Sequence, residues 1–248
     1  GKCLTIVIES DGKDEWVEGM PISRNWQDLS DKDMIDIIRD AGIVGMGGAT
    51  FPSHVKLSPP TDKKVEFFIL NGAECEPYLT SDYRSMLEYT DRIVSGVKII
   101  MKILKAEQGF VGIEDNKKDA IEIMEKAFQG TGVQVVSLPT KYPQGAEKML
   151  IKVLTGREVP SGRLPMDVGA VVQNVGTCIA VSDAVERGIP LIQRVTTLSG
   201  GALKEPKNLL LRIGTTFKYA IDLCGGFKEE PVKIVMGGPM MGFAQSNL

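Results

Sequence analysis

Two kinds of hydrophobic spacing alternate along the chain between about residue 30 and residue 188. Short apolar runs predict strands over 65–70, 109–115, 133–139 and 168–175. Apolar residues three or four positions apart predict helices over 30–41, 81–89, 91–106, 116–128, 145–156 and 177–188. Because strands that alternate with helices form parallel sheets, this region is predicted to be α/β, with a parallel sheet covered by helices on both faces.

Local signals mark the ends of several of these helices. Ser30 is predicted to cap the first helix, and Asp33 stands three residues later, as in a capping box. Thr90 is predicted to cap the helix that follows it. Gly42 and Gly156 suit the left-handed residue that commonly ends a helix.

The hydrophobic pattern changes after Pro190. The segments "IQRVTTLSGGAL" and "VKIVMGG" are typical of strands with Gly-Gly turns, and they flank a helix-like "TTFKYAIDLCGG". This order of strand, turn, strand, helix and strand predicts a second, small α+β unit of about sixty residues.

Composition and charge narrow the class of protein. The apolar and charged fractions, 43% and 25%, are those of an ordinary globular protein, and 248 residues suffice for a substantial core. The net charge is −3 and no long basic run occurs, which argues against a nucleic-acid partner. No stretch reaches the roughly 20 apolar residues that a membrane span requires. The N-terminal "GKCLTIVIES" lacks the apolar core and cleavage site of a signal peptide.

The four cysteines are far apart in the sequence and form no CxxC pair, so no zinc or iron–sulfur site is predicted within this chain, and no metal ligands are nominated. Scattered cysteines in a chain of this length are typical of free thiols in a reducing cytosol.

The segment "GIVGMGGATFPSHVKL", residues 42–57, is the most unusual stretch of the chain because four glycines fall within seven positions. It is neither a dinucleotide fingerprint, since Thr50 replaces the last glycine and the loop follows a helix, nor a P-loop, since no GK[ST] follows. Bare backbone would let a flat ring or a phosphate approach, with Lys56 as a cation, but a flexible connection explains the glycines equally well. His54, the single histidine, is interpreted as structural rather than catalytic.

Three further loops follow predicted strands, at the edge where open α/β sheets bind ligands. "NGAECEPY" contains Asn71, Glu74 and Glu76, "YPQGAEKML" begins a helix, and "VVQNVGT" contains Asn174 and Thr177 at a helix start that favours phosphate. Taken singly, the first is more commonly a solvated acidic turn before a helix, and Thr177 is explained simply as a helix cap.

Five motifs between about Asp28 and Gly242 resemble, in their order, those of the C subunit of Rnf electron transport complexes. They are "GxGGATFPxHVKL", "NGAECEPYLTSDYR", "YPQGAEKxLI", "PxxVGxVVQNVGT" and "GGPMMG". That family is related to the NADH-oxidising flavoprotein subunit of respiratory complex I. The resemblance implies a Rossmann-like domain that binds FMN over 28–189 and a β-grasp-like domain over 190–248. It also implies a remnant of an N-terminal sandwich domain or linker over 1–27, and a C-terminal domain with 4Fe-4S clusters that is absent from this chain.

The resemblance further implies a set of site residues. Those expected to bind FMN, with Glu76 also toward NAD(H), are Gly45, Gly47, Gly48, Lys56, Asn71, Glu74, Glu76, Asn174 and Thr177. Those expected to contact NAD(H) are Phe51, Glu76 and Glu147. Hydride transfer from nicotinamide to flavin requires orientation more than acid–base help, so no catalytic residue is nominated.

The implied function is electron transfer between NAD(H) and iron–sulfur clusters through FMN, in a membrane-bound NADH:ferredoxin-type oxidoreductase. Ferredoxin and the other subunits would be its partners, and the protein would lie on the cytoplasmic face of the membrane as a peripheral subunit. Related flavin-dependent proteins of cobalamin or proline reduction remain an alternative. A docking scaffold that has lost its flavin is a second alternative, which Ala73 and Ala146 favour because they depart from the motifs of the complex I relatives.

Overall fold

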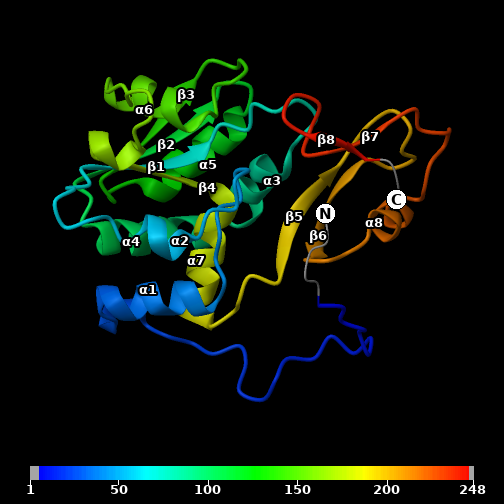
Figure 1. The fold of residues 1–248 in the computed structure, drawn as a ribbon, viewed down its shortest axis with the longest axis horizontal. Helices are drawn as coiled ribbons and strands as arrows, with labels where there is room; N and C mark the ends of the chain where they lie inside the picture. The colour runs from blue at the N-terminus through cyan, green and yellow to red at the C-terminus, as the bar shows by residue number, and fades with distance from the viewer. Residues whose placement is uncertain (1–5, 246–248) are drawn as a thin grey trace.

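A four-stranded parallel sheet forms the centre of the larger part of the protein (Figure 1). The computed structural model describes residues 6–245, so residues 1–5 and 246–248, with Cys3 and the outer ends of the predicted N-terminal and C-terminal parts, lie outside the description. In spatial order the strands are β3 (Val133–Leu138), β2 (Gln108–Glu114), β1 (Phe67–Gly72) and β4 (Ala170–Asn174). The four predicted strands are confirmed, and their bounds move by at most two residues.

Helices cover the two faces of this sheet unequally. One face packs on a large apolar core shared with α1 (Asp31–Asp40), α3 (Ser81–Glu88), α4 (Thr90–Leu104), α5 (Lys118–Phe128) and α7 (Val175–Arg187). The other face packs against α6 (Glu147–Thr155), beside the short 3₁₀ turn Pro165–Val168. The prediction of a parallel sheet covered on both faces is confirmed.

The local helix signals are confirmed in part. Ser30 and Asp33 form the capping box of α1, and Gly42 follows that helix with a φ of +67°. Gly156 ends α6 with a φ of +73°. The Thr90 cap is wrong, because Thr90 is itself the first residue of α4 and its hydroxyl donates to the carbonyl of Met86 at 2.6 Å.

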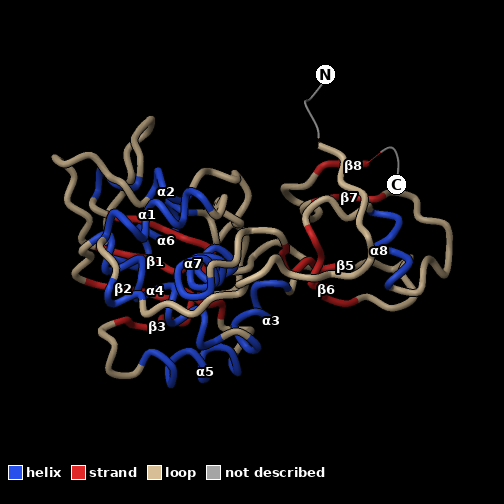
Figure 2. Tube along the Cα trace, turned by 90° about the horizontal axis from the view of Figure 1, so that it is seen from below, coloured by secondary structure: helices blue, strands red, loops and turns tan. Residues whose placement is uncertain are grey.

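The second, smaller unit contains two antiparallel strand pairs and one helix, and Figure 2 shows it set apart from the sheet. Its elements are β5 (Gln193–Leu198), β6 (Lys207–Arg212), α8 (Phe217–Leu223), β7 (Ile234–Met236) and β8 (Phe243–Gln245). A small core of Leu203, Ile221 and Cys224 holds it together. The predicted order is confirmed, with β8 as an additional strand.

The N-terminal segment runs along the outside of the protein without a helix or strand over 6–25. It continues into a 3₁₀ turn, Trp26–Asp28. Its main chain is hydrogen-bonded to the end of α7. The N–H groups of Ile22 and Arg24 donate to the carbonyls of Arg187 and Glu186, respectively. Within residues 6–245, none of the helices combines the length and the apolar character that crossing a bilayer requires.

Candidate functional site

The carboxyl ends of the parallel strands lie at one edge of the sheet, and the loops that carry the predicted site residues meet there. The N–H of Met46 donates to Thr177 Oγ1 at 3.0 Å, which connects the glycine loop to the start of α7. Asn71 Nδ2 donates to the carbonyl of Gly145 at 2.8 Å, which connects β1 to the segment before α6. The structure therefore brings the predicted loops together.

The glycine loop forms a narrow turn whose tip is exposed. The Gly45 N–H donates to the carbonyl of Phe51 at 2.9 Å, which closes the base of the turn. Gly48 has a φ of +136°, a conformation that a side chain would strain, and Gly47 faces Asn174, whose Cβ lies 3.5 Å from the place of a Cβ on that glycine. Phe51 is 51% exposed beside the loop. The tip thus presents bare backbone and one aromatic ring.

A one-turn helix, α2 (Ser53–Lys56), follows this loop, and the sequence did not predict it because four residues show no period. It places Lys56 Nζ 2.6 Å from Glu147 Oε1 in the first turn of α6, so a residue predicted to bind FMN pairs with one predicted to contact NAD(H). His54 is half-buried, and its carbonyl accepts a hydrogen bond from the Ser58 hydroxyl.

Glu74 caps helix α3. Its carboxylate accepts hydrogen bonds from the Asp82 N–H at 2.9 Å, the Tyr83 N–H at 3.1 Å and the Ser81 hydroxyl at 3.2 Å. These are donors of the first helical turn, and a carboxylate there is favoured by both hydrogen bonding and the helix dipole. Burial nevertheless raises the pKa of Glu74 above its ordinary value. Both oxygens of this carboxylate are therefore committed to protein groups.

Glu76, two residues further along the chain, bonds to the small unit instead of to α3. Its Oε1 accepts hydrogen bonds from the N–H groups of Met240 at 2.6 Å and Met241 at 3.3 Å, in the loop between β7 and β8. In Figure 1 this red loop turns back toward the segment that precedes α3. A residue predicted to face the ligands is thus bonded to the small unit.

Asn174 has partners at both ends of its side-chain amide. Its Oδ1 accepts from the Gly176 N–H at 2.8 Å and caps α7, and its Nδ2 donates to Asp82 Oδ2 at 2.6 Å. Thr177 is therefore not the cap of this helix. It is fully buried, and its hydroxyl oxygen accepts the hydrogen bond from Met46.

A buried ion pair at the same edge was missed by the sequence analysis. Glu114, the last residue of β2, is 1% exposed, and Lys117 is 8% exposed with its Nζ 3.0 Å from Glu114 Oε2. A carboxylate that ends an otherwise apolar strand was the available signal. Because lone buried charges are costly, the two residues stabilise the loop only as a pair.

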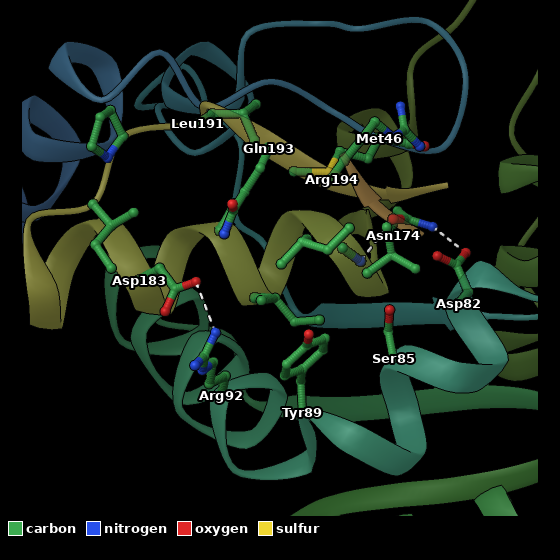
Figure 3. A pocket seen from close by; sticks show the side chains of 17 residues that line it. Met46, Asp82, Ser85, Tyr89, Arg92, Asn174, Asp183, Leu191, Gln193 and Arg194 are labelled. Carbon is green, nitrogen blue, oxygen red and sulfur yellow. Dashed lines mark hydrogen bonds and ion pairs between the residues drawn. The ribbon is translucent and has the colours of Figure 1, made fainter. Parts of the chain in front are cut away.

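A cavity of about 70 Å³ lies between the larger part and strand β5. Figure 3 shows Asp82 and Asn174 at one end, with their hydrogen bond, and Arg92 paired with Asp183 at the other. Arg194 on β5 lies above Asn174 in this view.

Residues 38–183 match the family described as the Nuo51 FMN-binding domain, which is more than half of the chain. The chain belongs to this family. Residues 195–244 match the SLBB domain, so the small unit is an SLBB domain. The predicted fold class, an α/β domain followed by a small β-grasp-like domain, is confirmed.

Curated relatives carry names that agree with the resemblance to the C subunit of Rnf complexes. The chain is 81% identical over its whole length to the C subunit of the proton-translocating ferredoxin:NAD(+) oxidoreductase complex of Clostridium ljungdahlii and spans 54% of that protein. It is 49% identical to the C subunit of the Na(+)-translocating ferredoxin:NAD(+) oxidoreductase complex of Acetobacterium woodii, with 98% of the chain aligned to 55% of that protein. The chain therefore spans about half the length of these relatives.

Solved structures support the fold. A crystal structure of NAD⁺-reducing [NiFe]-hydrogenase in the air-oxidised state superposes with a TM-score of 0.67 at 20% identity, over 79% of this chain and 39% of that one. The H₂-reduced state of an NAD⁺-reducing [NiFe]-hydrogenase gives a TM-score of 0.63 at 21% identity, over 77% of this chain and 38% of that one. At these identities the likeness shows the fold alone.

The carboxyl edge of the FMN-binding domain contains buried polar atoms without hydrogen-bond partners among the described residues. They are both amide atoms of Gln144, Nε2 of Gln173 and Oε1 of Glu114. Unpaired buried polar groups are costly and rare in native proteins, so each of these atoms, at or after the ends of β2, β3 and β4, is expected to pair with a polar group other than the described residues. A flavin ring has both donors and acceptors along its edge, and the side-chain amides of Gln144 and Gln173 have groups of both kinds, so these two residues fit FMN.

The pKa of Asp82 is raised far above the ordinary value of an aspartate. Burial, and then the neighbouring Glu74 carboxylate, raise the pKa of Asp82 to about 7, against the hydrogen bond from Asn174 and the charges of Arg194 and Lys117. In the unfolded chain an aspartate ionises near pH 4. Between pH 4 and 7 the folded protein thus holds more protons than the unfolded chain, so its free energy of unfolding falls as the pH rises.

Replacing Asp82 with asparagine is expected to remove this pH dependence. Relative to wild type, D82N should gain about 2 kcal/mol in free energy of unfolding when the pH is raised from 5 to 8. Urea denaturation at both pH values measures the difference, with the exposed Asp222→Asn as the control. Equal pH slopes for D82N and wild type would contradict the raised pKa.

Proposed function

We propose that this chain is the FMN-carrying part of the C subunit of an Rnf-type complex and that it exchanges electrons with NAD(H). The observation that carries the proposal is the match of residues 38–183 to the FMN-binding family, in a domain where the glycine loop contacts Asn174 and Thr177 at the carboxyl end of β4. The unpartnered amide atoms of Gln144 and Gln173 support it. The names of the curated relatives, which are C subunits of ferredoxin:NAD⁺ oxidoreductase complexes, support it.

FMN, when bound, supplies a ring that takes up a hydride from NADH and releases electrons one at a time. We assign Gly45, Gly47 and Gly48 to the backbone surface along the ring, where the absence of Cβ atoms permits close approach. Lys56 is paired with Glu147, and the Asn71 amide donates to the Gly145 carbonyl and accepts from the Ala73 N–H, so we assign both to the loop junctions that border the ring.

The remaining predicted residues have two roles. Glu74, Asn174 and Thr177 are already bonded within the protein, so we assign them to holding the loops around FMN rather than to its first contacts. Phe51, Glu76 and Glu147 are assigned to NAD(H), with Phe51 offering a ring for stacking. No residue is required to act as an acid or base.

The wider setting belongs to the same proposal. The whole protein would work with ferredoxin and the other subunits of a membrane complex, as a peripheral subunit on the cytoplasmic face. The 4Fe-4S clusters would be held by a segment outside this chain, since the relatives are about twice as long.

Adding FMN to the purified chain tests the proposal. We expect quenching of flavin fluorescence on binding and bleaching of the flavin absorbance when NADH is added without oxygen. Riboflavin, which lacks the phosphate, is the control and should bind more weakly. Protein that retains no flavin would refute the FMN assignment, and flavin that binds but is never bleached by NADH would refute the NAD(H) assignment.

A further inference from the structure

The SLBB domain is hydrogen-bonded to the FMN-binding domain at a small number of places. Within the described residues, each hydrogen bond between 193–245 and 31–189 ends on Met46, Glu76 or Thr80. Met46 lies inside the glycine loop, and the other two residues lie in the loop between β1 and α3. Both loops belong to the proposed flavin site.

The contact at Glu76 is built around glycines. The Gly237–Gly242 turn closes with a hydrogen bond from the Gly242 N–H to the Gly238 carbonyl at 2.9 Å. Gly238 has a φ of +90°, and a Cβ on it would lie 2.3 Å from Cγ of Glu76. Only glycine therefore lets the turn approach and direct two N–H groups at one carboxylate oxygen, a charge-assisted arrangement stronger than neutral hydrogen bonds.

Two other contacts hold the loops from strands β5 and β6. Arg194 Nη2 donates to the Met46 carbonyl at 3.3 Å, between two glycines that have no side chains to anchor the loop. The Thr80 N–H donates to Thr197 Oγ1 at 3.0 Å, and Asn208 Nδ2 donates to Thr80 Oγ1 at 2.9 Å. The loop between β1 and α3 is thus fixed at both Glu76 and Thr80.

We propose that the SLBB domain is a positioning element of the flavin site, with Gly238 and Arg194 as positioning residues that never touch the flavin. The glycine loop and the β1–α3 loop must be ordered to bind FMN, and a contact that orders them beforehand removes part of that entropic cost from binding. By linkage, if SLBB docking strengthens FMN binding by some factor, FMN strengthens SLBB docking by the same factor. This inference rests on the proposed FMN binding.

Flavin affinity of the full chain, measured by fluorescence quenching without NADH, tests the inference. Gly238→Ala and Arg194→Met are each expected to weaken FMN binding about tenfold, and Arg194→Lys should recover most of the loss because its ammonium still donates to the Met46 carbonyl. Gly201→Ala, where a Cβ meets nothing within 4 Å, and Arg212→Met on the neighbouring strand are the matched controls.

The rate of amide hydrogen exchange is a second measurement, and it separates a specific loss of coupling from general misfolding of a variant. In the wild-type chain, FMN should slow exchange at the Met240 and Met241 amides, and Gly238→Ala should abolish this effect while the amides of β1 and β2 stay protected. Wild-type protein that binds no FMN would defeat the proposed function. Wild-type protein that binds FMN, with variants of equal affinity and no change in exchange at these amides, would overturn this inference alone.

Discussion

Replacing Lys117 with methionine is expected to lower the free energy of unfolding by about 3–5 kcal/mol. The substitution leaves Glu114, which is 1% exposed, without its partner 3.0 Å away, and a buried carboxylate with no counter-charge is strongly unfavourable. Methionine keeps most of the volume of the lysine stem, so the loss reports charge rather than packing. Urea denaturation followed by circular dichroism measures it.

The double variant K117M/E114Q separates the charge from the side chain. Since a neutral amide at position 114 requires no counter-charge, the double variant should recover more than half of the loss. Lys218→Met, whose exposed partner is Asp222, should change stability by less than about 0.5 kcal/mol. A K117M protein as stable as this control would show that the buried pair does not stabilise the domain.

Adding one methyl group at Gly145 is expected to weaken FMN binding about a hundredfold, which corresponds to roughly 2.7 kcal/mol. A Cβ at this position would lie 2.2 Å from the carbonyl oxygen of Ala73, a backbone atom that cannot move without displacing the loop after β1. The same glycine accepts the hydrogen bond from Asn71, and its N–H donates to Cys75 Sγ at 3.3 Å. Gly145→Ala therefore separates two of the loops proposed to surround the flavin.

Titrating folded G145A protein with FMN measures the change in affinity. Gly201→Ala, where a Cβ meets nothing within 4 Å, is the glycine control. The far-ultraviolet circular dichroism of G145A should match that of wild type, because the displaced segments are loops rather than strands. Unchanged FMN affinity in a folded G145A protein would mean that this junction is not part of the flavin site.

The fold was predictable from the sequence where the relevant interactions are local. Short apolar runs identify the four strands, because strands of a covered parallel sheet are buried on both faces, and apolar residues three or four positions apart identify the long helices, because each helix buries one face. Ser30 and Asp33 identify the start of α1 for the same reason, since both partners lie within one turn. The elements that the sequence missed, α2 and β8, have four and three residues and show no period.

Contacts between distant segments could not be predicted this way. Thr90 resembles a cap by sequence, but its hydroxyl bonds to the turn before it. Thr177 also resembles a cap, yet its hydroxyl is occupied by the Met46 N–H, 131 residues away in the sequence. The partner of a short polar side chain depends on which backbone passes near it, and the fold decides that.

The sequence by itself determined the order of elements, the presence of a second small domain and the gathering of polar residues after the parallel strands. The tertiary structure alone decided what each of these residues bonds to. Glu74 and Glu76 are alike and separated by one residue, yet one caps α3 and the other accepts two N–H groups from the SLBB domain. In a strand these two residues would lie on the same face, but they follow β1 in a loop, where no such rule applies and the partners are supplied by segments that only folding brings close.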